Sequence, residues 1–209
     1  MELINYLNEH FYTKQQLLEL SKIPESVFEQ WQSNGLMPKC SYKLALNVES
    51  DSFFGIHAEA HTVEYYAKGY TAWLGNLQSI SDERSAYDLF SRRYQNAIAE
   101  LKAQGFVSQN SKVNDGLSQH IESEWQHFQN GIYGLCTQSG LPEDIAAKEF
   151  AIVIINELTE QENLTNAQLT QLEQAVNLLD SASALFAPHE RNNSSRHRLV
   201  DEVRRKYQL

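Results

Sequence analysis

The segment from Pro142 to Glu160 constrains the fold of this chain more than any other part of its 209 residues. Pro142 suits a first helical turn, and Glu143 and Asp144 place negative charge where the dipole of a helix is positive. The residues that follow are apolar on almost every side of the expected helix: Ile145, Ala146, Ala147, Phe150, Ala151, Ile152, Val153, Ile154 and Ile155. A helix without a polar face is normally buried. The sequence therefore predicts a helical bundle built around residues 142–160.

Most of the remaining chain also has the periodicity of helices. Its nine glycines and four prolines are too few for many tight β-turns, which favours long helices with short connections. Apolar spacing and capping patterns predict helices over residues 2–10, 14–21, 24–34, 57–67, 71–79, 83–104, 115–130, 142–160, 166–186 and 196–207. Thr13 with Gln16, and Thr165 with Gln168, have the capping-box pattern. We expect an all-α fold, in which only residues 42–48 alternate enough for a short strand or an extended linker.

Residues 11–38 have the layout of two short helices joined by a tight turn. The residues that carry this layout are Phe11, Tyr12, Thr13, Lys14, Leu17, Leu20, Ser21, Lys22, Ile23, Pro24, Phe28, Trp31, Asn34, Gly35, Leu36, Met37 and Pro38. The segment resembles the opening of a MerR-type or excisionase-type winged helix-turn-helix, in which the second helix ends in Gly-Leu before a Pro and a β-wing follows. The resemblance implies a bacterial, MerR-like DNA-binding regulator. The remainder of the chain is similar only to uncharacterised bacterial proteins and implies no activity.

The resemblance also implies a set of DNA contacts. These residues are Lys14, Lys22, Gln30, Lys39 and Lys43, of which the last two would lie in the wing. The family's phosphate-facing Arg and Tyr correspond here to Glu29 and Gln30, and a carboxylate would meet phosphate with the wrong sign. Two interpretations follow: a DNA-binding transcriptional regulator or regulatory adaptor, and a protein-interaction module without DNA binding.

The uneven distribution of charge limits where a nucleic acid can bind. Of the formal net charge of −10, residues 46–188 carry −12, residues 1–45 carry −1 and residues 189–209 carry +3. Phosphate affinity comes from Lys and Arg, so any contact with DNA must come from the two ends of the chain. The basic groups of the C-terminal tail are Arg191, Arg196, Arg198, Arg204, Arg205 and Lys206. They either bind phosphates beside the N-terminal module or form a solvated terminal helix that offsets the acidic middle.

Composition also bears on location and partners. The most apolar run, Phe150 to Ile155, is far shorter than the roughly 20 residues that a membrane-spanning helix needs. The start Met1-Glu2-Leu3 has no basic region of the kind that opens a secretory signal. Cys40 and Cys136 are expected to be reduced thiols. We therefore expect a cytoplasmic protein whose partners are DNA, another protein or a second copy, and not a membrane.

Two sets of histidine and carboxylate side chains are candidates for metal binding. His57, His61 and Glu64 would share one face of the predicted 57–67 helix, and His120, Glu124 and His127 one face of the 115–130 helix. Imidazole and carboxylate groups are ordinary ligands of Zn²⁺ and similar ions. If the two faces meet, the chain is a metal-binding helical bundle, which is a third interpretation of its function. A divalent metal ion is the one cofactor that the sequence indicates. Histidines on the surface beside a core explain the same pattern.

No arrangement of residues indicates catalysis. The sequence has no Gly-rich phosphate loop and no Gly-x-Ser-x-Gly motif, and neither cysteine lies in a nucleophile motif. We expect a non-enzymatic protein with a helix-turn-helix-like module at residues 1–48, a helical bundle at 53–188 and a basic tail at 189–209. Gly131, Gly134 and Gly140 are expected to let two long helices approach closely, or to open a small pocket at the start of the 142–160 helix, where an anion could bind.

Overall fold

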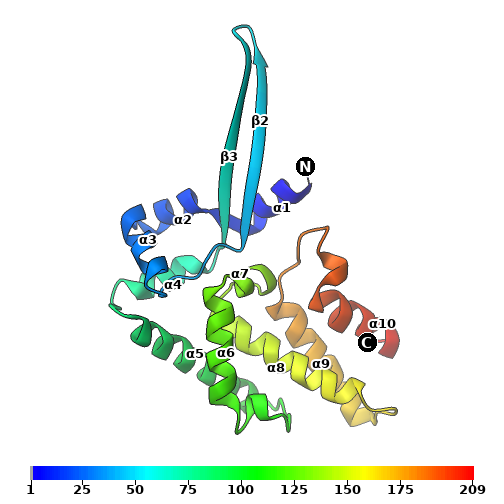
Figure 1. Ribbon diagram of the computed structural model, residues 1–209. Helices are drawn as coiled ribbons and strands as arrows, with labels where there is room; N and C mark the ends of the chain where they lie inside the picture. Colours follow the sequence, from blue (N-terminus) through cyan, green and yellow to red (C-terminus); the bar gives the residue numbers. More distant parts are fainter. Residues whose placement is uncertain (1) are drawn as a thin grey trace.

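The computed structural model describes residues 2–209 and is a mixed helix-and-sheet structure (Figure 1). Its α-helices are α1 (Glu2–His10), α2 (Lys14–Ser21), α3 (Glu25–Ser33), α4 (Tyr70–Leu77), α5 (Glu83–Ala103), α6 (Leu117–Gln129), α7 (Ile132–Cys136), α8 (Pro142–Thr159), α9 (Asn166–Ala182) and α10 (Glu202–Tyr207). Short helical turns are η1 (Ser111–Val113), η2 (Arg191–Asn193) and η3 (His197–Asp201). The strands are β1 (Phe11–Thr13), β2 (Tyr42–Ser52) and β3 (Gly55–Ala67). The predicted all-α fold class is therefore wrong, because three strands form an antiparallel sheet.

Strands β2 and β3 form a long hairpin, here called the arm, that projects from the rest of the molecule (Figure 1). Their pairing runs without interruption from Tyr42 opposite Tyr65 to Ser52 opposite Gly55. The sheet order is β1-β3-β2, and β1 pairs only with residues 65–67. Both edges of the arm are consequently free of strand partners along most of its length.

The helix predicted over residues 57–67 is the main error about secondary structure. His57, Ala58, Glu59, Ala60 and His61 are compatible with a helix by local propensity. The segment instead pairs with β2, which continues four residues beyond the alternating residues 42–48. Thr62, Val63, Tyr65 and Tyr66 are β-branched or aromatic residues, which strands favour. Gly55, with a φ of 106°, allows the tight turn that joins the two strands. Distant pairing here outweighs local propensity.

Around the base of the arm, the N-terminal helices are capped as the sequence predicts. The Thr13 side chain accepts a hydrogen bond from the Gln16 backbone, and the Gln16 side chain accepts one from the Thr13 backbone. A small apolar cluster of Leu7, Phe11 and Tyr65 holds α1 against the arm. The base of the arm is therefore fixed by packing, while the remainder of the arm is exposed.

The central position predicted for residues 142–160 is confirmed by α8. It packs against both α5 and α9, and Phe150, Ile154 and Ile155 have no exposed surface. Figure 1 shows α8 and α9 running side by side in the lower half of the molecule. The second predicted capping box, Thr165 with Gln168, begins α9.

Trp73 on α4 joins the N-terminal module to the helical bundle. Its indole Nε1 donates to the backbone oxygen of Leu36 at 2.9 Å, and its ring has no exposed surface. The same ring contacts Trp125 and Phe128 on α6 in tilted and edge-on arrangements. One side chain therefore satisfies a backbone group after α3 and fills the core of the bundle.

Glycines permit a close approach here, but between the α6–α7 region and the segment before the arm rather than between two long helices as the sequence predicts. At Gly131, which has a φ of 78°, an added Cβ would lie 2.6 Å from the backbone oxygen of Cys40 and 2.7 Å from that of Lys39. At Gly134 a Cβ would overlap the Ser41 hydroxyl. Backbone atoms cannot move aside as a flexible side chain can, so Gly131 is required on two grounds.

We predict that Gly131→Ala lowers the free energy of unfolding by about 3 kcal/mol, because it combines a left-handed backbone with overpacking. Gly105→Ala is the matched control, since Gly105 also has a positive φ, of 99°, but open space around the added Cβ. It should cost only about 1 kcal/mol. Urea denaturation measures both values. Equal losses in the two variants would contradict the packing argument.

Candidate functional site

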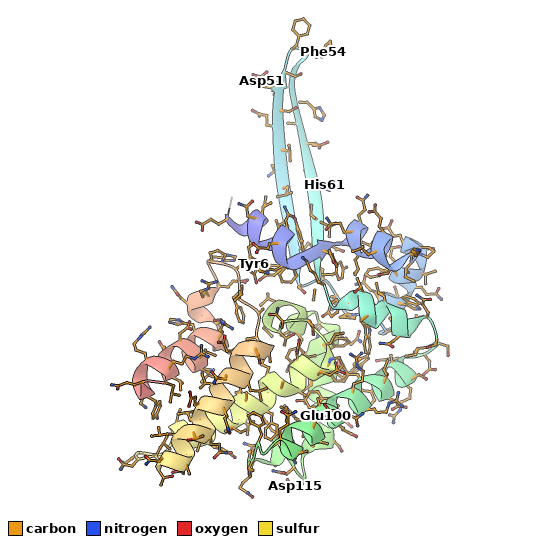
Figure 2. The ribbon with its side chains drawn as sticks, turned by 180° about the vertical axis from the view of Figure 1, so that it is seen from behind. Tyr6, Asp51, Phe54, His61, Glu100 and Asp115 are labelled. Atoms are coloured by element: carbon orange, nitrogen blue, oxygen red, sulfur yellow. The ribbon has the colours of Figure 1, made fainter. Side chains whose placement is uncertain are left out.

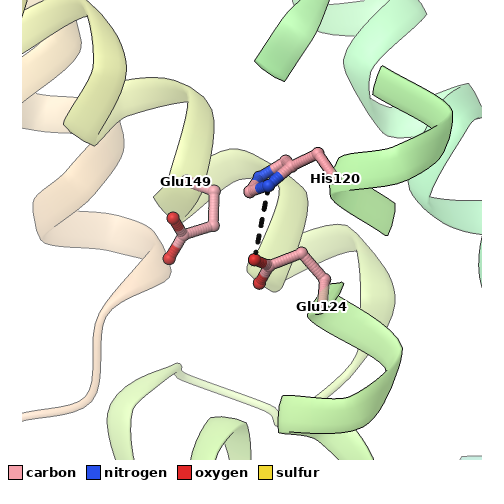
Figure 3. Close-up of side chains that lie close together, drawn as sticks. All are labelled: His120, Glu124 and Glu149. Carbon is pink, nitrogen blue, oxygen red and sulfur yellow. Dashed lines mark ion pairs between the residues drawn. The ribbon is translucent and has the colours of Figure 1, made fainter. Parts of the chain in front are cut away.

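A cluster of ionisable side chains lies within the otherwise apolar bundle (Figure 3). His120 and Glu124 are one turn apart on α6, and Glu149 reaches toward them from α8. The His120 Nδ1 atom lies 3.5 Å from Glu124 Oε1. One nitrogen or oxygen atom from each of the three side chains lies within 4.8 Å of the others. We call these three residues the polar cluster.

The polar cluster is shielded from water. The side chains of His120 and Glu124 are 8% and 5% exposed, and that of Glu149 is 17% exposed. Lys148, also buried, lies beside the cluster and places its Nζ atom 3.0 Å from Glu149 Oε1. Buried charges are costly unless they are paired, so the Lys148–Glu149 pair accounts for one of the two carboxylates. Glu124 has no comparable cation.

The environment of Glu124 favours its protonated form. Burial, followed by the negative charge of Glu149, raises the pKa of Glu124 to about 8. Burial lowers the pKa of His120, although Glu149 opposes that shift. For Lys148, burial acts to lower the pKa, but Glu149, Cys136 and Glu124 together outweigh it and the pKa is raised. The cluster and the adjacent Lys148 therefore hold one ion pair, a neutral imidazole and a carboxyl group that keeps its proton at neutral pH.

Three buried polar atoms around the cluster have no hydrogen-bond partner in the protein. They are His120 Nε2, Glu124 Oε2 and the hydroxyl oxygen of Tyr94. The Tyr94 ring packs edge-on against His120, with ring centroids 6.3 Å apart. Buried polar groups are rarely left unpaired, so the three atoms mark a place where something other than a side chain is expected to bind.

The sequence identified two members of this cluster and missed the third. The i, i+4 spacing of His120 and Glu124 predicts that they share one helix face, and the structure confirms this. Both side chains are buried, so the alternative that they lie on the surface beside the core is wrong. The apolar character of residues 145–155 does not predict a role for Glu149. The adjacent pair Lys148 and Glu149, which interrupts that apolar segment, is the signal that would have revealed it.

The second predicted group of metal ligands, His57, His61 and Glu64, does not share one face of a helix. His57, His61 and Glu64 lie on β3, where the two-residue period of a strand puts Glu64 on the side opposite the histidines. Figure 2 shows His61 partway along the projecting arm, far from the bundle. Glu64 instead lies 3.3 Å from the Nζ atom of Lys43. The two predicted faces therefore do not meet.

His127 lies beside the polar cluster without belonging to it. Its Nδ1 atom is 3.8 Å from Glu124 Oε1, and half of its side chain is exposed. Its ring packs edge-on against Tyr133. It marks the side on which the cluster approaches the solvent.

The residues predicted to contact DNA are largely engaged with the protein itself. Lys14 Nζ lies 2.7 Å from Glu25 and 3.0 Å from Glu29, both on the exposed side of α3. Lys39 donates to the side chain of Asn130, and Lys43 pairs with Glu64. Two more predicted contacts, Lys22 and Gln30, are exposed at the start of the turn and on α3. The predicted contacts do not form a common basic surface.

The surface between α2 and the arm is acidic. A groove there is lined by Lys14 together with Glu19, Glu25 and Glu64. Phosphate groups entering this groove would meet three carboxylates and one ammonium group that already has two acidic partners.

The basic C-terminal tail does not neutralise the acidic groove between α2 and the arm. Arg196 and Arg204 both pair with Asp180 on α9, which attaches the tail to the bundle. Figures 1 and 2 show α10 on the side of the molecule opposite α3. Arg198, Arg205 and Lys206 remain exposed there. The tail forms a basic surface of its own, remote from the N-terminal module.

The tip of the arm presents an apolar surface to solvent (Figure 2). Phe53 and Phe54 are 97% and 96% exposed, and Ile56 is 72% exposed. The two phenylalanine rings contact only each other, with ring centroids 5.3 Å apart in an edge-on arrangement. Large apolar side chains exposed together in this way usually mark an interaction site.

Both cysteines are free thiols in a setting that suppresses their reactivity. Burial raises the pKa of Cys40, and it raises that of Cys136 to about 11. Since the thiolate is the reactive form, neither thiol has the environment of a nucleophile.

Together these features describe a helical bundle with a buried polar cluster, to which a small N-terminal module with a projecting arm is attached. The chain belongs to a family of unknown function, DUF6058, whose family model matches residues 86–208. The match contains every residue of the polar cluster and none of the arm. No curated protein and no solved structure matches the chain. Within residues 2–209, no helix combines the length and the apolar character needed to cross a membrane.

The buried carboxyl group of Glu124 leads to a prediction about stability and pH. In the unfolded chain Glu124 ionises near its ordinary value of 4.5, whereas in the folded protein it ionises near 8. Between these values the folded state binds the extra proton, so stability falls as pH rises, and the loss is complete above pH 8.

We therefore predict that Glu124→Gln stabilises the protein by roughly 2–4 kcal/mol at pH 8 and by less than about 1 kcal/mol at pH 5. Denaturation with urea, in buffer containing a chelator, measures the difference. Glu122→Gln, an exposed position on the same helix, is the control and should have little effect at either pH. A stabilisation of Glu124→Gln that does not change with pH would contradict the shifted ionisation.

Proposed function

We propose that this protein is a non-enzymatic regulatory adaptor whose arm binds another protein. The observation that carries the proposal is the apolar tip of the arm, formed by Phe53, Phe54 and Ile56. Nothing in the protein covers this tip, and a partner that buried it would gain roughly 1.5–3 kcal/mol for each side chain fully removed from water.

The dimensions and charge of the arm indicate how a partner is reached. Its eleven paired residues per strand span roughly 35 Å at the rise of an antiparallel strand. Along that length Lys43 is outnumbered by Glu49, Asp51, Glu59 and Glu64. The arm thus combines an apolar tip with an acidic shaft, and its complement is an apolar pocket bordered by basic groups.

The same charges speak against DNA as the partner. The element order α1-β1-α2-α3-β2-β3 is compatible with a winged helix-turn-helix, and DNA binding is therefore the alternative function. However, non-specific affinity for DNA depends on Lys and Arg that neutralise phosphates. Here Lys14 is bound between Glu25 and Glu29, and the arm, which corresponds to the wing, is acidic.

A second copy of the chain is the partner that we expect for the arm. The basic tail leaves Arg198, Arg205 and Lys206 exposed on the side of the molecule away from α3. Charge complementarity of this kind guides association and excludes other partners. Two copies related by a two-fold axis can each place an arm on the tail surface of the other.

We predict that the protein forms a dimer at micromolar concentration and that Phe53→Ser with Phe54→Ser makes it a monomer. The loss follows from removing the apolar contact at the tip of the arm. Light scattering coupled to size-exclusion chromatography measures the mass. Val107→Ser, which removes an apolar side chain with 57% exposure outside the arm, should leave the dimer intact. A wild-type protein that is monomeric at every concentration would exclude this partner.

Reversal of charge tests which surfaces meet. Glu49→Lys with Glu59→Lys on the arm, and Arg198→Glu with Arg205→Glu on the tail, should each weaken the dimer. A mixture of the two variants should restore association, because every reversed arm then has a reversed tail to bind. No recovery in the mixture would show that the arm binds elsewhere.

Binding to a random-sequence DNA duplex at low salt distinguishes the alternative function. We expect none. DNA binding that weakens steeply with salt and is lost in Lys39→Glu with Lys43→Glu would instead favour a DNA-binding regulator.

A further inference from the structure

The geometry points to a divalent transition-metal site formed by His120, Glu124 and Glu149. The inference concerns the bundle and is independent of the protein that the arm binds. It starts from the donor set, one imidazole nitrogen and two carboxylates, which is a combination that Zn²⁺ and related ions accept. These three donors are the one such group found among residues 2–209.

Two buried atoms without hydrogen-bond partners support the presence of a ligand at this cluster. His120 Nε2 and Glu124 Oε2 belong to side chains that are over nine-tenths buried, and neither has a hydrogen-bond partner in the protein. In Figure 3 the three side chains converge from α6 and α8 on a common space. One ion can bind only one ring nitrogen of His120. An ion at Nε2 would give that atom its partner, whereas an ion at Nδ1 would leave Nε2 to a water molecule.

The distances are compatible with a bound ion after a small adjustment. Ligand atoms at 2.0–2.2 Å from a tetrahedral zinc lie about 3.3–3.6 Å from one another. His120 and Glu124 already meet this requirement, with 3.5 Å between Nδ1 and Oε1. Glu149 must approach from within 4.8 Å. Because a carboxylate has two oxygens, Glu149 can contribute one to the ion and keep the other near Lys148.

The charges around the cluster also favour a cation. Glu124 and Glu149 have one neighbouring ammonium group between them, that of Lys148, so a further cation is needed when both carboxylates are ionised. His120 would supply a nitrogen ligand without adding negative charge. Three protein ligands leave a fourth position for water, as in zinc sites that are open to a substrate. The Tyr94 hydroxyl, on the ring that packs against His120, is also without a partner. The partly exposed Glu149 and His127 define the solvent side of the cluster.

The test uses the full chain, purified without a histidine tag, stripped with a chelator and titrated with Zn²⁺ by calorimetry. We expect one ion per chain and a rise in the melting temperature. Substitution of Co²⁺ should give visible absorption bands that report nitrogen and oxygen ligands in low coordination.

Glu149→Gln and His120→Gln keep the shape of the site and should weaken Zn²⁺ binding by more than the roughly 10- to 100-fold that loss of an outer-shell group costs. His57→Ala with His61→Ala on the arm is the matched control and should leave the affinity unchanged. Circular dichroism establishes that each variant is folded. Folded wild-type protein that binds no Zn²⁺, or binding that survives Glu149→Gln and His120→Gln, would overturn the assignment and leave buried water as the occupant. Neither result affects the association of the arm.

Discussion

The indole of Trp73 is the contact on which the relation between the two parts of this molecule depends. Its N–H group satisfies the backbone oxygen of Leu36 where the α3 segment ends, and its ring fills the aromatic core against Trp125 and Phe128. Trp125 follows Glu124 directly on α6, so the same helix carries the polar cluster. The position of the arm relative to the bundle is therefore set through a core that also supports the cluster.

Much of the helical structure follows from local signals in the sequence. The capping boxes at Thr13 and Thr165 predict two helix starts, and the apolar α8 predicts its own central position. The arm could not be predicted in this way, because its stability comes from pairing between residues 42–52 and 55–67 rather than from either segment alone. Alanine, glutamate and histidine in the outer half of β3 are compatible with a helix, and only the partner strand decides the outcome.

The polar cluster could likewise be predicted only in part from the sequence. Helical spacing alone brings His120 and Glu124 together, since residues four apart share a face. Glu149 comes from another helix, and its approach depends on how α6 and α8 are placed within the bundle. The family match over residues 86–208 covers this cluster but excludes the arm. The protein thus combines a bundle that the family shares with a module that has its own surface and chemistry.

The construction of the arm makes its reach adjustable in discrete steps. Because α1 and β1 hold only its base, residues can be gained or lost beyond that base without disturbing either core. Two residues added to each strand would move the tip outward by about 7 Å and keep every side chain on its original face. A single residue added to one strand would turn the side chains beyond it to the opposite face. Changes made in pairs would therefore alter the distance between the tip and the bundle without turning the tip to another face.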